Sequence, residues 1–411
     1  MELERAVARM RRAIKKSMSA GDRNMNQERM NRIPHVRRQI KRVATGILAL
    51  VFYVASGVQA EPYLAIQEGY KCSKCHVNMT GGGKRTDFGN IYAQTRLANK
   101  FIDWRQMLLA SADGEDDENP YKEDSASSFF TGRLNDYIAI GGDFRFRYER
   151  SEIPTNPSQD VFKQRKQSLY LEIDLVPEHI IFYQTLTGGG DAREIFGLFR
   201  WKSFYLKGGE FFLPYGLRLL DDSAVTRAVT GFTYGITDAG VELGYEPGNW
   251  AMHLAATNGT GASLENNRTK RLTGSLAYVR KRFRLGGSYS ANKDAQGVET
   301  IIYGIHGGTQ IGRVGILAAA DIIDDSIDQQ FVSIVELNLL MSRGNNLKFS
   351  YEYHDPSELI AQNVRERYSL VWEPFLFQLA QFRAGVRENR GIPQSNVQNE
   401  TEYFLELHLF L

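Results

Sequence analysis

The sequence contains little cysteine and almost no net charge. Only two of its 411 residues are cysteines, which is too few for a disulfide framework. The 50 basic and 48 acidic residues nearly balance. The first 60 residues hold 13 basic and 4 acidic residues. The remaining residues therefore hold 37 basic and 44 acidic residues, a net charge of −7. Because the positive excess lies in this leader, we expect no nucleic acid among the partners.

Long apolar runs are also missing, with one exception near the N-terminus. Residues 43–58 form an uncharged run of 16 residues, which follows four basic residues and ends in a small-x-small triplet. This order predicts a secretory signal peptide over residues 1–60, and a start at Met30 would give it an ordinary length. A membrane anchor is the alternative, although a span needs about 20 apolar residues. The basic residues are Arg37, Arg38, Lys41 and Arg42, and the triplet is Val58-Gln59-Ala60.

Both cysteines fall in one short motif. Cys72 and Cys75 are separated by two residues and followed directly by His76, which is the attachment pattern of a c-type haem. Two thiols at this spacing can reach both vinyl groups of one porphyrin, and the histidine then supplies the proximal iron ligand. A thioredoxin-like pair and a plain disulfide are alternatives, whereas structural zinc lacks its other ligands. We therefore predict one covalent haem c on a monohaem cytochrome segment over residues 61–112.

The second axial ligand of this haem is left open. Met107 is a candidate, because methionine fills this position in cytochromes c. Trp104, Met107 and Leu108 also have helical spacing, so Met107 can equally be a core residue. Met79 follows His76 too closely to reach the opposite face of the haem. Water, Lys84 or a histidine of the barrel described next are the remaining candidates.

Beyond an acidic linker over residues 113–130, the pattern is that of a membrane barrel. Segments of about ten residues alternate apolar and polar side chains. We count 16 such segments from about residue 137 to Leu411, joined alternately by long polar loops and tight turns. This alternation, with an even strand number, is typical of outer-membrane barrels. Loops are expected near 151–160, 187–193, 213–230, 258–268, 291–298, 322–329, 354–364 and 388–399, and turns at Pro177-Glu178, Trp201, Pro247-Gly248, Lys281-Arg282, Ile311-Gly312, Gly344-Asn345 and Pro374.

The predicted fold class is therefore all-β. A transmembrane antiparallel β-barrel of about 16 strands, over residues 131–411, follows a small, mainly helical c-type cytochrome segment. The last strand, residues 403–411, alternates as barrel-assembly signals do, with its aromatic residue one place before the end. We expect the protein in the bacterial outer membrane, with outer-membrane lipid around it and the haem segment entering from the periplasmic side.

A short monohaem segment joined to a porin-sized barrel resembles the fused cytochrome–porin family of outer-membrane iron oxidases. The matching residues are Tyr63-Leu64-Ala65, the motif from Cys72 to His76 and Thr86-Asp87-Phe88-Gly89, whereas a Gly-Gly-Gly run stands where a proline- and leucine-bearing segment is expected. The barrel alone also resembles phosphate-selective porins around residues 234–241. The cytochrome–porin resemblance implies an iron:cytochrome oxidoreductase, which passes electrons from extracellular ferrous iron or another donor to a periplasmic cytochrome or other carrier.

Physical reasoning favours the same function and leaves a second one open. The hydrocarbon core of a bilayer is about 30 Å thick, too thick for efficient electron tunnelling, and a haem inside a barrel would shorten the gap. Residues 61–112 are too few to enclose a haem alone, so we expect them to plug the lumen. Candidate partners of the haem propionates are the lumen-facing Arg145, Arg147, Arg383 and Arg387. The alternative function is a solute porin, of the anion or phosphate type, with a haem-bearing plug.

Overall fold

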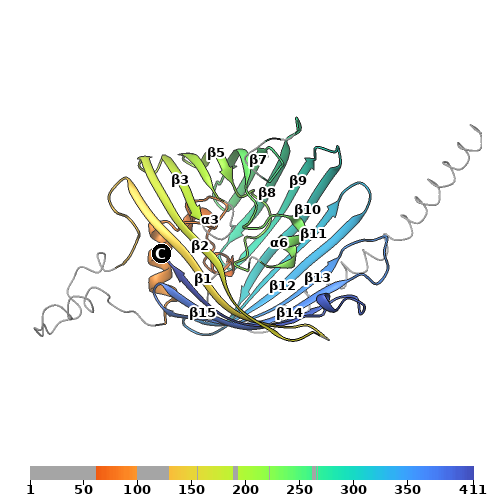
Figure 1. Ribbon diagram of the computed structural model, residues 1–411. Helices are drawn as coiled ribbons and strands as arrows, with labels where there is room; N and C mark the ends of the chain where they lie inside the picture. Colours follow the sequence, from red (N-terminus) through yellow and green to blue (C-terminus); the bar gives the residue numbers. More distant parts are fainter. Residues whose placement is uncertain are drawn as a thin grey trace, which may run out of the picture. The chain divides into compact units, whose positions relative to one another are not determined.

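The computed structural model describes residues 62–99, 129–154, 156–187, 193–221, 223–261, 265 and 267–411. Within these residues, 16 antiparallel strands form a closed barrel in which each strand pairs with its neighbours in sequence and β1 pairs with β16 (Figure 1). The predicted fold class and strand number are confirmed. The predicted signal peptide, Met107 and most of the predicted linker lie outside the described residues.

Eleven of the 16 strands have ten or more residues, enough to cross a bilayer when tilted, and β3 to β7 are shorter, with seven or eight. In chain order, the strands are β1 (Ile138–Glu152), β2 (Gln159–Val176), β3 (Ile180–Thr187), β4 (Ile195–Trp201), β5 (Phe204–Phe211), β6 (Asp238–Tyr245), β7 (Trp250–Thr257), β8 (Arg271–Arg280), β9 (Phe283–Lys293), β10 (Glu299–Ile311), β11 (Val314–Asp324), β12 (Gln329–Ser342), β13 (Asn345–Asp355), β14 (Arg365–Phe377), β15 (Ala380–Arg390) and β16 (Thr401–Phe410).

Alternation along each strand separates an apolar outer face from a polar inner face. On β1, Phe146 is 57% exposed whereas Arg147 is 2% exposed. On β16, Leu405 is 48% exposed and Glu406 is 1% exposed. Successive side chains of a strand point to opposite sides, so the apolar set faces outward, where a barrel meets lipid, and the charged set faces the lumen.

The seven tight turns all leave one end of the barrel, which we call the short-turn end. Glu178, Lys202, Gly248 and Arg282 are turn residues with φ of 65°, 53°, 51° and 66°, the left-handed conformation that short hairpin turns require. The turn predicted at Pro374 was wrong, because β14 continues to Phe377. Pro374 pairs with the first residue of β13, at the very end of that ladder, where a missing N–H removes no interior hydrogen bond.

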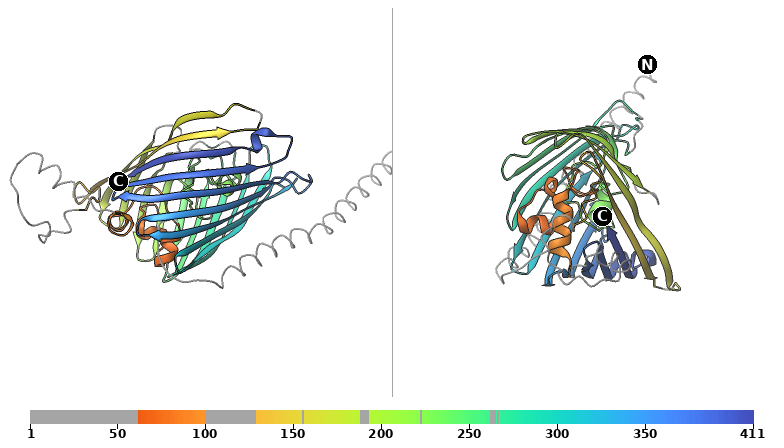
Figure 2. Two further views of the ribbon diagram at one scale, coloured as in Figure 1. Left: turned by 90° about the horizontal axis from the view of Figure 1, so that it is seen from below. Right: turned by 90° about the vertical axis from the view of Figure 1, so that its left-hand side faces the viewer.

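Two segments lie inside the barrel (Figure 2). The first, residues 62–99, we call the plug. It contains α2 (Pro62–Glu68), α3 (Cys72–Cys75), α4 (Asp87–Tyr92) and the π-helix η1 (Ala93–Leu97). The second is the β5–β6 connection, residues 212–237, which carries α6 (Val225–Thr230). A 3-10 helix, η2 (Asn396–Gln398), lies in the last long loop. No helix in the described ranges combines the length and apolarity needed to cross a membrane.

Candidate haem-binding site

The plug is fastened to the lumen wall by buried polar contacts. Lys84 Nζ lies 2.7 Å from Glu172 Oε2 of β2, and both side chains are buried. Asn78 Nδ2 donates a hydrogen bond to Glu194 Oε1 at 2.6 Å, and both of these residues are also buried. Buried charges and amides are tolerated only when they are paired, so these contacts fix the position of the plug against β2 and the start of β4.

The plug also touches the tight turns, so it sits towards the short-turn end. Arg282 N, in the β8–β9 turn, donates to Ile66 O at 2.7 Å. Lys71 Nζ donates to Glu246 O, beside the β6–β7 turn, at 2.6 Å. Gly69 has a φ of 73°, and an added Cβ there would lie 2.5 Å from Lys281 N. The backbone of the plug therefore packs directly on the turn after β8.

The motif forms one helical turn followed by a tight reversal. His76 N donates to Cys72 O at 3.0 Å, which closes the turn of α3. The chain then folds back, and Val77 N donates to Lys84 O at 3.0 Å. The reversal is residues 81–83, with φ of 97°, 78° and 65°, a conformation that glycine adopts without steric penalty. The Gly-Gly-Gly run, where the sequence departs from the family pattern, is thus what brings the chain back beside His76.

Glycine is needed a second time where α4 packs on the motif. Thr86 caps α4, because its Oγ1 accepts a hydrogen bond from Gly89 N at 3.1 Å, as N-cap threonines do. A Cβ added at Gly89 would overlap the carbonyl of Cys75. The Thr-Asp-Phe-Gly motif therefore starts a helix whose first turn lies against the backbone of Cys75.

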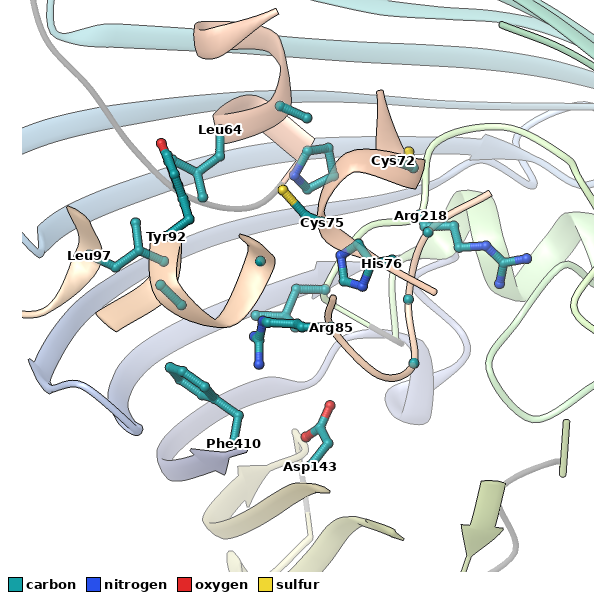
Figure 3. A pocket seen from close by; sticks show the side chains of 18 of the residues that line it. Leu64, Cys72, Cys75, His76, Arg85, Tyr92, Leu97, Asp143, Arg218 and Phe410 are labelled. Atoms are coloured by element: carbon teal, nitrogen blue, oxygen red, sulfur yellow. The ribbon is translucent and has the colours of Figure 1, made fainter. Parts of the chain in front are cut away.

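The two thiols and the imidazole line one cavity inside the barrel (Figure 3). The empty volume of this cavity is about 1470 Å³, including the part open to solvent. The apolar part of its lining comes from both the plug and the wall. It includes Leu64, Tyr70, Tyr92, Leu97, Phe375 and Phe410. The basic part consists of Lys71, Arg85, Arg145, Lys166, Arg218 and Arg284.

The ionisation of the motif suits metal binding better than thiol redox chemistry. Burial, followed by the nearby Arg85 charge, lowers the pKa of His76 to about 4, so its imidazole is neutral at pH 7. Its Nδ1 is buried without a hydrogen-bond partner within the described chain. Burial and the Cys72 thiol raise the pKa of Cys75 to about 11, whereas a reactive redox thiol needs a lowered pKa.

The structure around the motif gives little support to a disulfide, a metal cluster or a thioredoxin-like pair. Cys72 and Cys75 are not joined in a disulfide. In the part of the chain that the structure describes, no three His, Cys, Asp or Glu side chains form a cluster that could hold a metal ion. A thioredoxin-like pair requires a strand–helix scaffold, whereas α3 is followed by a glycine reversal.

All four arginines predicted to meet haem propionates are paired with carboxylates inside the barrel, and Arg145 contacts Asp143 at 3.0 Å. Arg147 contacts Glu402 and Glu406 at 3.1 and 2.8 Å. Arg383 contacts Glu373 and Glu406 at 2.8 and 2.7 Å, and Arg387 contacts Asp221 and Glu402 at 2.5 and 3.2 Å. None of the last three lines the cavity, whereas Arg145 does. Alternation identified the correct face of each strand but not which charges meet across the lumen.

The candidates for the second axial ligand of the haem iron differ in whether they line the cavity. Lys84 is held by Glu172 and by Arg85 O, at 3.1 Å, and does not line the cavity. Met79 lines a different groove. His408 of β16 does line the cavity, with its Nε2 3.1 Å from Asp143 Oδ1. Among the proposed side chains that the structure describes, this barrel histidine lines the cavity, whereas Met107 lies outside the described residues.

Sequence reasoning missed the part of the site that the β5–β6 connection supplies. Gly216, Leu217, Arg218, Leu220 and Tyr234 of this connection all line the cavity. Its fold in the lumen is fixed by Asp221, whose carboxylate pairs with Arg387, and by Val225 N, which donates to Glu352 Oε2 at 2.5 Å. The only signal was the unusual length of the connection, which does not show that it folds inward.

The residues present fit a c-type haem. The macrocycle needs an apolar enclosure, its iron needs a neutral imidazole, its vinyl groups need two thiols and its propionates need cations. The cavity offers each of these. Cys72, Cys75 and His76 would hold the ring and the iron, and Arg85, Lys166 and Arg218 would meet the carboxylates, whereas Arg145 is already paired with Asp143.

Comparisons with known proteins bear on the barrel. No family model matches the chain, and no curated protein matches its sequence. Among solved structures, a loop-deletion mutant of OmpT, an outer membrane protein of Vibrio cholerae, is similar with a TM-score of 0.51 and 11% identity, covering 67% of this chain and 100% of that one. An anion-selective porin from Comamonas acidovorans gives a TM-score of 0.51 and 8% identity, covering 67% and 99%. At such identities the likeness shows a porin-like fold.

Proposed function

We propose that this protein is a porin-like outer-membrane barrel that carries a c-type haem in its lumen and serves as an electron conduit. The observation that carries the proposal is the position of the motif. Cys72, Cys75 and His76 line one cavity inside the barrel, bounded by the plug, the wall and the β5–β6 connection. The haem, when bound, supplies a reversible one-electron iron couple. The expected donor is extracellular, ferrous iron first of all, and the expected acceptor is a periplasmic cytochrome or other carrier.

The protein's own residues have separate parts in this function. The wall strands isolate the cavity from lipid, and Lys84 with Glu172 holds the plug at a fixed depth. Tyr92 and Phe410 help to keep the cavity apolar, and Arg85 lies 4.3 Å from the centre of the Phe410 ring.

A solute porin with a haem-bearing plug is the second candidate, and the comparisons favour it over the conduit. The barrel has the fold of porins, one of which is described as anion-selective. The lumen wall beyond the cavity is lined by paired charges, such as Arg147 with Glu406, as expected for a hydrophilic passage. In this reading the plug narrows the passage and the haem has a lesser role.

The first test concerns the cofactor that both candidates share. The purified wild-type protein should stain for haem on a denaturing gel. Cys72→Ala and Cys75→Ala should lose normal two-thioether attachment, while the heat-modifiable shift of a folded barrel remains. A wild-type band that carries no haem would refute both candidate functions, the electron conduit and the porin with a haem-bearing plug.

The second test separates the two candidates. Ferrous iron, or another reductant that cannot cross the membrane, is offered outside intact cells, and the haem spectrum is followed. Reduction in the wild type supports the conduit. If the haem is never reduced from outside, while the protein passes ions freely in a planar bilayer, the conduit is wrong and the porin candidate holds.

A further inference from the structure

Exposed basic residues gather at the short-turn end, around the plug. The plug and the tight turns from β4 to β13 carry seven exposed basic residues. Among their described acidic residues, the Asp87 side chain is 43% exposed and is paired with Arg133 at 3.1 Å. The exposed acids Asp136 and Glu178 lie beside β1 to β3 instead. The basic set is Lys74, Arg96, Lys202, Lys281, Arg282, Arg313 and Arg343. We call these residues the basic rim.

Two members of the basic rim occupy conformationally unfavourable positions. Lys202 and Arg282 have φ of 53° and 66°. The left-handed conformation costs an ordinary residue about 1–2 kcal/mol, whereas glycine adopts it freely. Turns of the same kind use Gly248, Gly312 and Gly344. Glu178 has a φ of 65° in the β2–β3 turn, so these turns accept charged residues of either sign in this conformation, and the case for the basic rim rests on where its charges gather.

The basic rim continues into a groove beside the haem-binding motif. The groove is lined by four basic residues, Lys71, Lys74, Arg200 and Lys202, and by one acidic residue, Glu246. Ser73 and Lys74, the two residues between the cysteines, both line it. A protein seated here would touch α3 itself, so its redox group could approach any group bound to the two thiols closely.

We infer that the basic rim and this groove are the docking surface for an acidic face of the partner protein that exchanges electrons at the short-turn end. The inference rests on the proposed function and adds the chemistry of the partner. Opposite potentials steer such encounters and raise association rates by about 10–10³-fold. One electron would leave the haem iron, which goes from Fe²⁺ to Fe³⁺, and reduce the acceptor by one electron.

A membrane surface is the competing explanation for basic residues near a barrel rim. Phospholipid phosphates could attract the turn residues, which lie at the end of the wall. They could not attract Lys71 and Lys74, because these belong to the plug inside the ring of strands, where Lys71 Nζ is bonded to Glu246 O. Lys202 Nζ lies 5.0 Å from the centre of the outward-facing Trp201 ring, so it is the two lysines of the plug, at the groove, that favour a protein partner.

The test uses full-length protein in phosphatidylcholine nanodiscs and a matched pair of probes. Native cytochrome c is basic, and succinylation converts its lysines to carboxylates without changing its haem. We expect the succinylated probe to bind about tenfold more tightly at low ionic strength and to lose this advantage near 0.5 M salt. K281E/R282E should weaken its binding about threefold or more, whereas the control K293E/R365E, which changes the same charges at the opposite end, should not.

Four results would overturn the inference. The first is equal affinity of the native and the succinylated probe, and the second is an equal loss of affinity in K281E/R282E and in the control variant. The third is a K281E/R282E variant that loses affinity only for phosphatidylglycerol vesicles. The fourth is binding of the succinylated probe that appears only after the acidic residues at 115–118 are replaced by amides. Binding is also measured with the Cys72→Ala/Cys75→Ala protein, which carries no haem. Rim-dependent binding without electron exchange in the wild type would support the docking surface and refute the conduit, so the two failures are distinguishable.

Discussion

The buried ion pair between Lys84 and Glu172 should control how firmly the plug is held. Its Nζ–Oε2 distance is 2.7 Å, and the two side chains are 1% and 7% exposed. In Lys84→Met the carboxylate of Glu172 stays buried and loses its cation, and breaking a buried pair in this way costs about 3–5 kcal/mol. We take about 3 kcal/mol for local release of the plug, which is roughly a 100-fold increase in its opening equilibrium.

Amide hydrogen exchange in the full-length protein measures this opening. The reporters are Val77 N–H and Thr86 N–H, which donate to Lys84 O and Cys75 O at 3.0 Å each. Lys84→Met should speed their exchange about 100-fold, while exchange in the barrel strands stays unchanged. The double variant Lys84→Met/Glu172→Met removes both charges and should recover most of the protection. Unchanged exchange in the single variant, or a double variant as fast as the single, would refute the reasoning.

Three further predictions follow from other contacts. Gly89→Ala should detach α4 from α3 at a cost of about 1–3 kcal/mol, seen as faster trypsin cleavage in the plug, whereas Gly197→Ala, with nothing within 4 Å of the added Cβ, should leave cleavage unchanged. Asp221→Ala removes a partner of Arg387 and should loosen the β5–β6 connection, so single-channel conductance should rise; an unchanged conductance would contradict this. An epitope tag at Gly248 should be inaccessible on intact cells, because the short-turn end is expected in the periplasm, and surface labelling there would reverse the orientation.

The barrel was predictable because its signals are local. Successive residues on a strand face opposite sides, so the sequence alone predicts that Phe146 faces lipid and Arg147 faces the lumen. The alternation of long loops and tight turns is also visible in the sequence. Pro374 misled because a proline usually ends a strand, yet at the last rung of the β13–β14 ladder it is tolerated.

The site was predictable only where it is contiguous in sequence. Cys72, Cys75 and His76 are adjacent, and their spacing carries the chemistry. The remaining lining comes from distant segments, and only the register of the whole barrel determines which charges meet. Arg147 and Glu406, for example, are 259 residues apart in sequence yet bonded. The inward fold of the β5–β6 connection depends on similar long-range pairs, so Arg218 could not be assigned to the cavity from the sequence.

The closure of the barrel around the plug restricts access to the two thiols during biogenesis. The plug precedes β1, and the last pairing to form in chain order joins β1 to β16, for instance Phe146 with Leu407. After that step Cys72 and Cys75 lie inside a closed ring of strands, and an enzyme that makes thioether bonds would have to reach them through the short-turn end. Attachment before closure would avoid this restriction, and it would require the unclosed chain to survive long enough in the periplasm to receive the group.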